Sequence, residues 1–261
     1  MSDIRDLLYP DDPAQPKDAF VSARQAMKKP LPKRFYKDVT VEPGEGGHLI
    51  LLDGKRARTP ARNLLALPTD AAAQLVAAEW AAQTTEIDPA EMHATRIVNI
   101  GLDRVGAVRA EVIDEIVKYA GTDLVCYRAD APEGLVTREN AAWNPVLEHV
   151  RRHHGARFVL SQGIGYAEQA PAALAAIRAA YGRVESPLAL AALHTLVTLS
   201  GSALIALSFA DGVITAEDAF AAASVEEDWN THLWGEDAEA AHRRARRQRE
   251  FMSAAALFRA L

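Results

Sequence analysis

The longest uncharged stretch of this sequence runs from Ser186 to Ala210 and contains no Asp, Glu, Lys or Arg in 25 residues. Pro187 stands in the first turn, where its missing N–H would have no helical partner anyway. Gly212 follows the run, as glycine often follows the end of a helix. A continuous helix here would be roughly 36 Å long, which is enough to cross either a membrane or a small domain.

The surroundings of this stretch favour protein over lipid. Its flanks are acidic, at Glu185 and Asp211, and they carry neither a Lys/Arg cluster nor a Trp/Tyr belt. A helix that is apolar on every side and lies outside lipid must be covered by protein. We therefore predict a buried central helix, in which the small residues Ser200–Ser202 allow a neighbouring helix to approach closely.

Composition is that of an ordinary globular protein, with 49% hydrophobic and 25% charged residues. A chain of 261 residues can form one large domain or two modest ones. Its first 16 residues lack the apolar segment of a signal peptide. The single cysteine, Cys126, excludes an internal disulfide and fits a reducing compartment. We expect a cytoplasmic protein that is not an integral membrane protein.

The N-terminal part predicts a small antiparallel sheet after a loosely ordered arm at residues 1–30, in which only residues 18–29 suggest a short helix. Segments with strand character, separated by turn signals, lie at residues 35–41, 48–52, 55–59 and 63–67. Asp53-Gly54 is a typical tight-hairpin turn, and the glycines at 44–47 favour a hairpin loop over an anion nest.

Helical periodicity dominates after Thr69, which is a plausible N-cap. The break at 87–89 predicts a boundary between a β-rich domain at 1–90 and a helical domain at 91–261. The expected class is α+β, with a small β-rich domain followed by a larger, mainly α-helical orthogonal bundle. Further helices are predicted at residues 69–83, 90–103, 107–120 with a continuation over 122–128, 137–154, 170–181, 186–210, and after Thr215, Ser224 and Asp237.

Two short apolar pieces at 158–160 and 164–166 interrupt this helical pattern. They flank Gly163 and predict a hairpin packed on the helices. Trp80 and Trp143 stand in apolar helical contexts and are predicted to be structural.

No catalytic constellation stands out in the sequence. There is no HExxH, GxSxG, Walker or complete GxGxxG motif. His149 and His153 form an i, i+4 pair, but no carboxylate or third His stands nearby at motif spacing. His194, inside the apolar run, is predicted to be a hydrogen-bonded core residue. We therefore expect a protein that is not an enzyme and that needs no cofactor or metal.

A series of short motifs, rather than any single one, is recognisable. In chain order these are Arg34-Phe35-Tyr36-Lys37-Asp38-Val39, Leu52-Asp53-Gly54-Lys55, Thr59-Pro60, Glu79-Trp80-Ala81-Ala82-Gln83, Ile87-Asp88-Pro89, Met92 with Thr95-Arg96 and Asn99, Tyr119 with Thr122-Asp123-Leu124 and Cys126-Tyr127-Arg128, Trp143-Asn144-Pro145, Leu199-Ser200-Gly201-Ser202, Glu226-Glu227-Asp228-Trp229 and Trp234-Gly235-Glu236-Asp237. Over about residues 33–250 the sequence resembles the assembly chaperones of the F-type ATP synthase, as a bacterial member of the family that includes mitochondrial assembly factors. It departs from the family pattern at His93, Ile100 and Asn144.

The resemblance implies a small β-rich domain, a larger helical bundle and no catalysis. Family members bind the unassembled α subunit of the ATP synthase and shield its β-subunit interface until the β subunit replaces them. Shielding an exposed apolar patch prevents self-association. We accordingly expect the α subunit as partner, no nucleic acid, and a monomer.

The acidic stretch 211–239, with nine carboxylates and no Lys or Arg, is our candidate for the partner-binding surface. Aromatic side chains flanked by acids suit an anchor with a charged rim. An ordinary solvated helix with buried tryptophans is the alternative. The candidate residues are Glu226, Glu227, Asp228, Trp229, Trp234, Glu236, Asp237 and Glu239.

Two other functions stay open at the level of sequence. One is a small-molecule enzyme with a pocket between the domains, using His93 or His194 with Asp123 or Glu79. The other is an RNA-binding adaptor that uses the C-terminal arginines between Arg243 and Arg249. Glu239 stands four residues before Arg243, in the order that favours an intrahelical ion pair instead.

Overall fold

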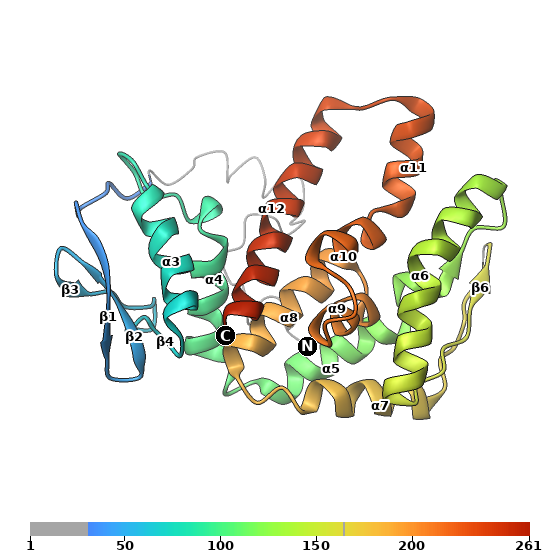
Figure 1. The fold of residues 1–261 in the computed structure, drawn as a ribbon, viewed down its shortest axis with the longest axis horizontal. Coiled ribbons are helices and arrows are strands. Elements are labelled where there is room, and N and C mark those ends of the chain that lie inside the picture. Colours follow the sequence, from blue (N-terminus) through green and yellow to red (C-terminus); the bar gives the residue numbers. More distant parts are fainter. Residues whose placement is uncertain (1–30, 164) are drawn as a thin grey trace, which may run out of the picture. The chain divides into compact units, whose positions relative to one another are not determined.

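The computed structural model describes residues 31–163 and 165–261, so the predicted arm at 1–30, with its helix at 18–29, lies outside the described residues (Figure 1). The chain divides into two compact units. The first runs to Gly106 and includes Ala260 and Leu261, and the second comprises Ala107–Arg259.

The first unit combines the predicted small antiparallel sheet with two helices, of which only the one at 69–83 was predicted for the N-terminal domain. Strand β2 lies at the centre of the sheet and pairs with β1, β3 and β4. The elements are β1 (Val39–Gly44), β2 (Gly47–Leu52), β3 (Lys55–Arg56), β4 (Ala66–Leu67), α3 (Asp70–Ala82), a 3-10 turn (Pro89–Glu91), α4 (His93–Ile100) and a π turn (Gly101–Val105). Asp53 and Gly54 both have positive φ and form the predicted tight turn between β2 and β3.

Helix α3 begins where the sequence places it, because the Thr69 side chain accepts a hydrogen bond from the Ala72 N–H at 3.1 Å. The helix packs on β1, β2 and β4. Its buried Val76 and the strand residues Ile50 and Leu67 have no exposed surface. Burial of these side chains supplies the main stabilisation of this unit.

Helix α4 has no N-cap side chain of its own, and Glu79 of α3 takes over that role. The Glu79 carboxylate accepts hydrogen bonds from the backbone N–H groups of Ala94 at 2.7 Å and Thr95 at 2.8 Å. This contact joins α4 to the first unit, so the boundary between the compact units follows Gly106 rather than the Pro89 break. The division into a β-rich domain at 1–90 and a helical domain at 91–261 stays a prediction.

The second unit is almost entirely helical, which confirms the predicted α+β class. Helices α8 and α9 contact α5, α6 and α10 (Figure 1). The elements are α5 (Arg109–Gly121), a 3-10 turn (Leu124–Cys126), β5 (Tyr127–Arg128), α6 (Glu133–His154), β6 (Ser161–Gln162), α7 (Pro171–Gly182), α8 (Pro187–Ser200), α9 (Ala203–Ala210), α10 (Ala216–Ala223), α11 (Val225–Trp234) and α12 (Ala238–Ala260).

The central apolar stretch is buried as predicted, but the prediction of one continuous helix is wrong. Gly201 ends α8 in the left-handed conformation, with φ of 69°. Ser202 then caps α9 by accepting a hydrogen bond from the Ile205 N–H at 3.0 Å. A Cβ at Gly201 would meet no atom within 4 Å, so the glycine serves the turn and not a close helix approach. Among the described residues, no helix has the combined length and apolarity that a membrane span requires.

Asp123 explains both the break and the end of α5. Its buried carboxylate accepts hydrogen bonds from the Ser202 hydroxyl at 2.5 Å and from the Leu204 N–H at 3.0 Å. The predicted helical continuation over 122–128 is therefore wrong, since Asp123 starts a 3-10 turn that leads into β5. Burial raises the pKa of Asp123 to about 7, although these donors favour its ionised form.

The predicted hairpin at 158–160 and 164–166 is also wrong, as far as the described residues show. Strand β6 instead pairs in parallel with the distant β5, with Tyr127 opposite Ser161. The Gln169 side chain takes the place of a second strand. It accepts from the Val159 N–H at 2.8 Å and donates to the Val159 carbonyl at 2.9 Å.

Candidate partner-binding surface

Helix α11 carries five of the eight candidate residues, and its sequence favours a helix start and a helix end at the observed positions. Glu226, Glu227 and Asp228 lie in its first turn, where negative charge interacts favourably with the helix dipole. Gly235 ends the helix with φ of 83°. Asp237 caps α12 as predicted, because its carboxylate accepts from the Ala240 N–H at 2.8 Å.

Helices begin after Thr215 and after Ser224, as predicted, but the capping box that such sequences suggest forms only at Thr215. Ser224 closes α10 and opens α11 at the same time, and its ψ of 8° is far from the extended value of an N-cap residue. Its buried hydroxyl has no hydrogen-bond partner among the described residues.

Arginines of α12 bind acids of α11 and of their own helix. Arg247 donates to the Glu227 carboxylate, and Arg244 donates to that of Asp228 at 2.6 Å. Arg243 pairs with Glu239 within α12 at i, i+4 spacing. Three arginines proposed for RNA binding are thus committed to acids of the same chain.

The two tryptophans of α11 have opposite environments. Trp229 packs against α6, where Arg138 lies 5.0 Å from the centre of its ring. Trp234 is 82% exposed, and its neighbour Leu233 is 50% exposed. Trp229 therefore fixes α11 on the bundle, while Trp234 is available to a partner.

Glu226 and Glu236 accompany Trp234 as exposed residues, and within residues 31–163 and 165–261 neither makes an ion pair. The eight candidates thus separate into two groups. Trp234, Glu226 and Glu236 face solvent, and the remaining candidates make contacts inside the protein or cap a helix.

An open pocket of about 570 Å³ lies beside α11. Four candidates line it, namely Glu226, Glu227, Trp234 and Asp237, together with Leu124, Trp143, Ala223, Asn230, Thr231, Gly235, Ala240 and Arg247. The structure therefore brings half of the predicted residues to one cavity with an acidic rim.

Asn230 and Thr231 are pocket residues that the sequence reasoning missed. Glu226, Asn230 and Trp234 are spaced at i, i+4 and i+8, which places them on one face of a helix. This spacing is enough to place Asn230 on the same helix face as Glu226 and Trp234 from the sequence alone. No comparable signal marks Leu124 or Ala223, which reach the pocket from other elements.

Trp143 is structural, as predicted. It has no exposed surface, its Nε1 donates to the Ala222 carbonyl at 2.7 Å, and the Arg128 guanidinium lies 5.1 Å from its ring centre. Trp80 is half-buried and packs on Tyr36 at a ring distance of 5.7 Å. Both tryptophans anchor helices in their own units.

The residues of the enzyme alternative serve other roles. His194 is buried and its Nε2 lies 2.8 Å from the Glu115 carboxylate, which confirms the predicted hydrogen-bonded core histidine. Asp123 caps α9 instead of pairing with His194. His93 is buried at the start of α4.

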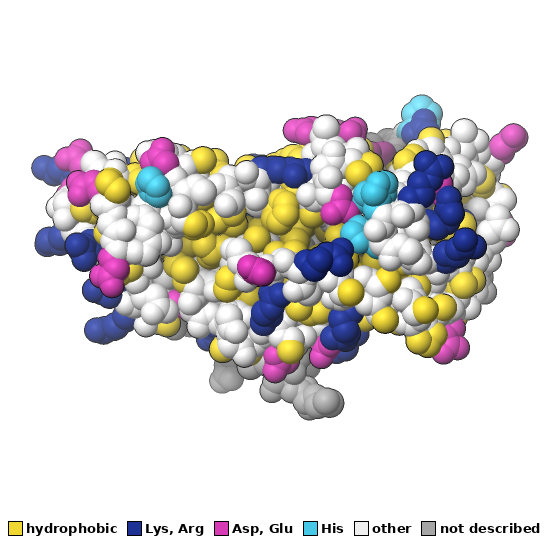
Figure 2. Space-filling model, turned by 60° about the horizontal axis from the view of Figure 1, so that its bottom comes forward, with side chains coloured by type: hydrophobic (Ala, Val, Ile, Leu, Met, Phe, Trp, Pro, Cys, Tyr) yellow, Lys and Arg dark blue, Asp and Glu magenta, His cyan; other side chains and the backbone are white. Residues whose placement is uncertain are grey.

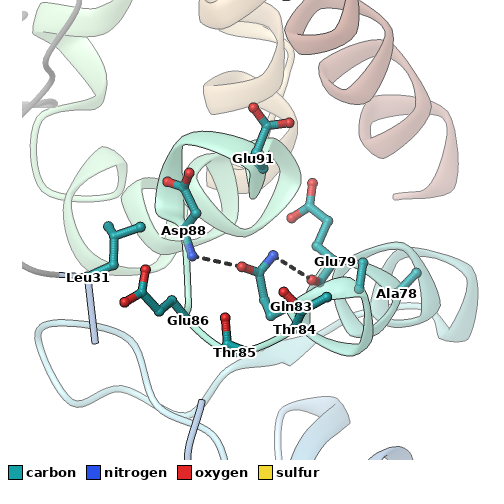
Figure 3. A pocket seen from close by; sticks show the side chains of 10 residues that line it. Leu31, Ala78, Glu79, Gln83, Thr84, Thr85, Glu86, Asp88 and Glu91 are labelled. Atoms are coloured by element: carbon teal, nitrogen blue, oxygen red, sulfur yellow. Dashed lines mark hydrogen bonds between the residues drawn. The ribbon is translucent and has the colours of Figure 1, made fainter. Parts of the chain in front are cut away.

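A second pocket, of about 690 Å³, lies within the first unit and is lined by carboxylates (Figure 3). Glu79, Glu86, Asp88 and Glu91 surround the side chain of Gln83, whose amide accepts from the Asp88 N–H at 2.7 Å and donates to the Glu79 carbonyl at 3.1 Å. These contacts shape the turn between α3 and α4. Because the Glu79 carboxylate itself caps α4, it is not available as a catalytic base.

These features define a class of protein: a mainly helical protein that presents, among its described residues, an exposed tryptophan together with acids that make no ion pair there and a pocket lined partly by acids. Residues 33–151 match the family described as ATP12 chaperone protein. The crystal structure of the Atu1473 protein from Agrobacterium tumefaciens, described as a candidate chaperone, is 43% identical in sequence, with a TM-score of 0.83 over 95% of this chain and 92% of that chain.

Atp12 from Paracoccus denitrificans is 35% identical, with a TM-score of 0.79 over 87% of this chain and 97% of that chain. A point mutant of the same Paracoccus protein matches equally well. The chain therefore belongs to the ATP12 chaperone family, and the resemblance seen in the sequence is confirmed.

Proposed function

We propose that this protein acts in assembly of the F-type ATP synthase by binding the unassembled α subunit and shielding its β-subunit interface. Its role is that of a binding partner and not of an enzyme. Family membership supports the chaperone role in ATP synthase assembly. Trp234 and its acidic neighbours support a specific contact surface.

The observation that carries the proposal is the exposure of Trp234 on a segment whose acids Glu226 and Glu236 make no ion pair with any residue that the structure describes. A large aromatic side chain that is 82% exposed leaves apolar area in water unless a partner covers it. Exposed Glu226 and Glu236 flank it in sequence. Buried aromatic anchors supply much of the affinity of an interface, whereas charges at its rim steer association.

The decisive experiment is a titration of purified α subunit with wild-type protein and with the double variant Glu226→Lys/Glu236→Lys. We expect the variant to bind more weakly, because each reversal replaces a favourable rim charge by a repulsive one. The loss of affinity for the α subunit should increase as the salt concentration is lowered toward about 0.01 M, where the Debye length reaches roughly 30 Å. Circular dichroism checks that the fold is intact.

A matched control is Glu42→Lys/Glu45→Lys, which changes the net charge equally at two exposed positions of the β1–β2 hairpin. This control should retain wild-type affinity at both salt concentrations. Equal affinities of the wild type and the α11 variant at both salts would remove α11 from the binding surface. No binding of α subunit by the wild type would contradict the proposed partner itself.

A further inference from the structure

We propose that His149, His154 and Asp211 form a binding site for a transition-metal cation of the Zn²⁺ type. The two histidines lie near the end of α6, and Asp211 follows the last residue of α9. One ligand atom from each of the three side chains lies within 4.8 Å of the other two. This cluster is separate from α11 and independent of the proposed chaperone contact.

The two imidazole rings point toward the same carboxylate oxygen. Both Nε2 atoms, of His149 and of His154, lie 2.7 Å from the same oxygen, Oδ2 of Asp211. The histidine side chains are only 5% and 7% exposed, whereas that of Asp211 is 31% exposed. The imidazoles are thus held by the protein interior, and the carboxylate leaves an open side for water as a further ligand.

The ligand types select the metal. Imidazole nitrogen favours Zn²⁺, Ni²⁺ and Cu²⁺, whereas Mg²⁺ and Ca²⁺ prefer oxygen ligands alone. Zn²⁺ is commonly held by three protein ligands with water in the fourth position. A set of two histidines and one carboxylate matches that pattern.

A bound metal would change the spacing of the three ligand atoms. Zn–N and Zn–O bonds of about 2.0–2.2 Å place two tetrahedral ligands roughly 3.3 Å apart. The two Nε2 atoms, which now lie within 4.8 Å of each other, would likewise settle about 3.3 Å apart. Asp211 would lie about 0.6 Å further from each Nε2 than in its present hydrogen-bonded position. Its side chain is the most exposed of the three and lies at a helix end, so this movement is compatible with the surrounding packing.

Some charges around the cluster favour cation binding and others oppose it. His154 is the last residue of α6, where the partial negative charge of the helix end attracts a cation. Arg183 opposes binding, since its guanidinium lies 3.4 Å from Nδ1 of His154. Arg183 is exposed and can turn into solvent. His side chains lie beside basic and acidic ones on the face of the protein in Figure 2.

Sequence patterns alone do not reveal this site, because only the spacing of His149 and His153 is visible in them. His153 is exposed and its Nδ1 lies 3.2 Å from the His149 carbonyl, so it is not one of the three ligands. The carboxylate comes from a residue 57 positions after His154, brought there by the packing of α9 on α6.

Equilibrium dialysis of untagged, full-length protein against Zn²⁺ tests the proposal, with Mg²⁺ as the comparison ion. We expect about one Zn²⁺ per chain, no uptake of Mg²⁺, and a rise in melting temperature with Zn²⁺ that a chelator reverses. Asp211→Asn keeps a hydrogen-bond acceptor for the histidines but loses the charged ligand, so its affinity should fall at least about tenfold. His154→Gln should fall similarly and provides a second variant if the first does not fold.

His242→Gln is the control, because it removes one exposed histidine outside the cluster. It should bind Zn²⁺ as the wild type does and show the same thermal shift. Failure of the wild type to bind Zn²⁺, or equal affinity in the wild type, Asp211→Asn and His154→Gln, would overturn the assignment. Both readouts are independent of binding to the α subunit.

Discussion

The indole ring of Trp229 occupies the space that a side chain at Gly134 would need. A Cβ at Gly134 would lie 2.6 Å from Cη2 of Trp229, which is closer than such contacts allow. This contact sets how closely α11 approaches α6. The position of the proposed binding helix therefore depends on a glycine in the second residue of α6.

Gly134→Ala should destabilise the protein by about 1–3 kcal/mol, the usual cost of overpacking, even though alanine is the better helix former. Denaturant unfolding measures the change. Gly182→Ala is the control, because a Cβ there meets no atom within 4 Å. The control should be neutral or stabilise by up to about 1 kcal/mol. Similar effects of the two substitutions would contradict the close contact with Trp229.

Trp143→Ala and Trp234→Ala should separate stability from binding. Trp143 is fully buried, so its truncation should cost about 3–5 kcal/mol. Trp234→Ala, at an exposed position, should change stability by less than about 0.5 kcal/mol but weaken capture of the α subunit. Denaturant unfolding and α-subunit titration on both variants check this. A Trp143→Ala protein of unchanged stability that fails to bind would place Trp143 in the interface instead.

Gly201→Ala should destabilise the protein by about 1–2 kcal/mol, because an L-residue is strained at φ of 69°. Open space around this position excludes a steric clash as the cause. The measurement is the midpoint of urea unfolding, again relative to Gly182→Ala. If Gly201→Ala were as stable as the control, the backbone at the α8–α9 break would have to differ from the one described.

Asp123 should make stability depend on pH between the ordinary carboxyl pKa of 3.8 and its raised pKa of about 7. In this interval the folded state retains a proton that the unfolded state has lost. The contribution of Asp123 to the free energy of unfolding is therefore complete below the pKa of the unfolded state, and it is lost as the pH rises through the folded-state pKa of about 7. Relative to Asp123→Asn, the wild type should lose unfolding free energy from about pH 4 to about pH 7. A difference that stays constant or grows over this range would show that Asp123 is ionised in the folded state.

Local patterns predicted much of the fold. Thr69, Thr215 and Asp237 begin helices as their side chains suggest, since a cap depends on a few neighbouring residues. The break at Gly201 was missed for a physical reason. It is stabilised by Asp123, which lies 79 residues before Ser202 in the chain, and hydropathy does not record such a partner.

The candidate site was predicted at the level of a segment and not of individual contacts. Composition drew attention to Trp229 and Trp234 equally, because both stand among acids. Only the packing of α11 distinguishes them, since Gly134 and Arg138 cover one and nothing described covers most of the other. Charge patterning likewise did not reveal that Arg244 binds Asp228.

The cap that Glu79 provides for α4 has a consequence for hydrogen exchange. The amide protons of Ala94 and Thr95 are bonded to a carboxylate of α3 and not to a residue of their own helix. They can exchange with solvent only when Glu79 withdraws, so opening of α3 should expose both amides together. Helices α3 and α4 should therefore open cooperatively. The amides that exchange most slowly should lie on both sides of the turn at Pro89.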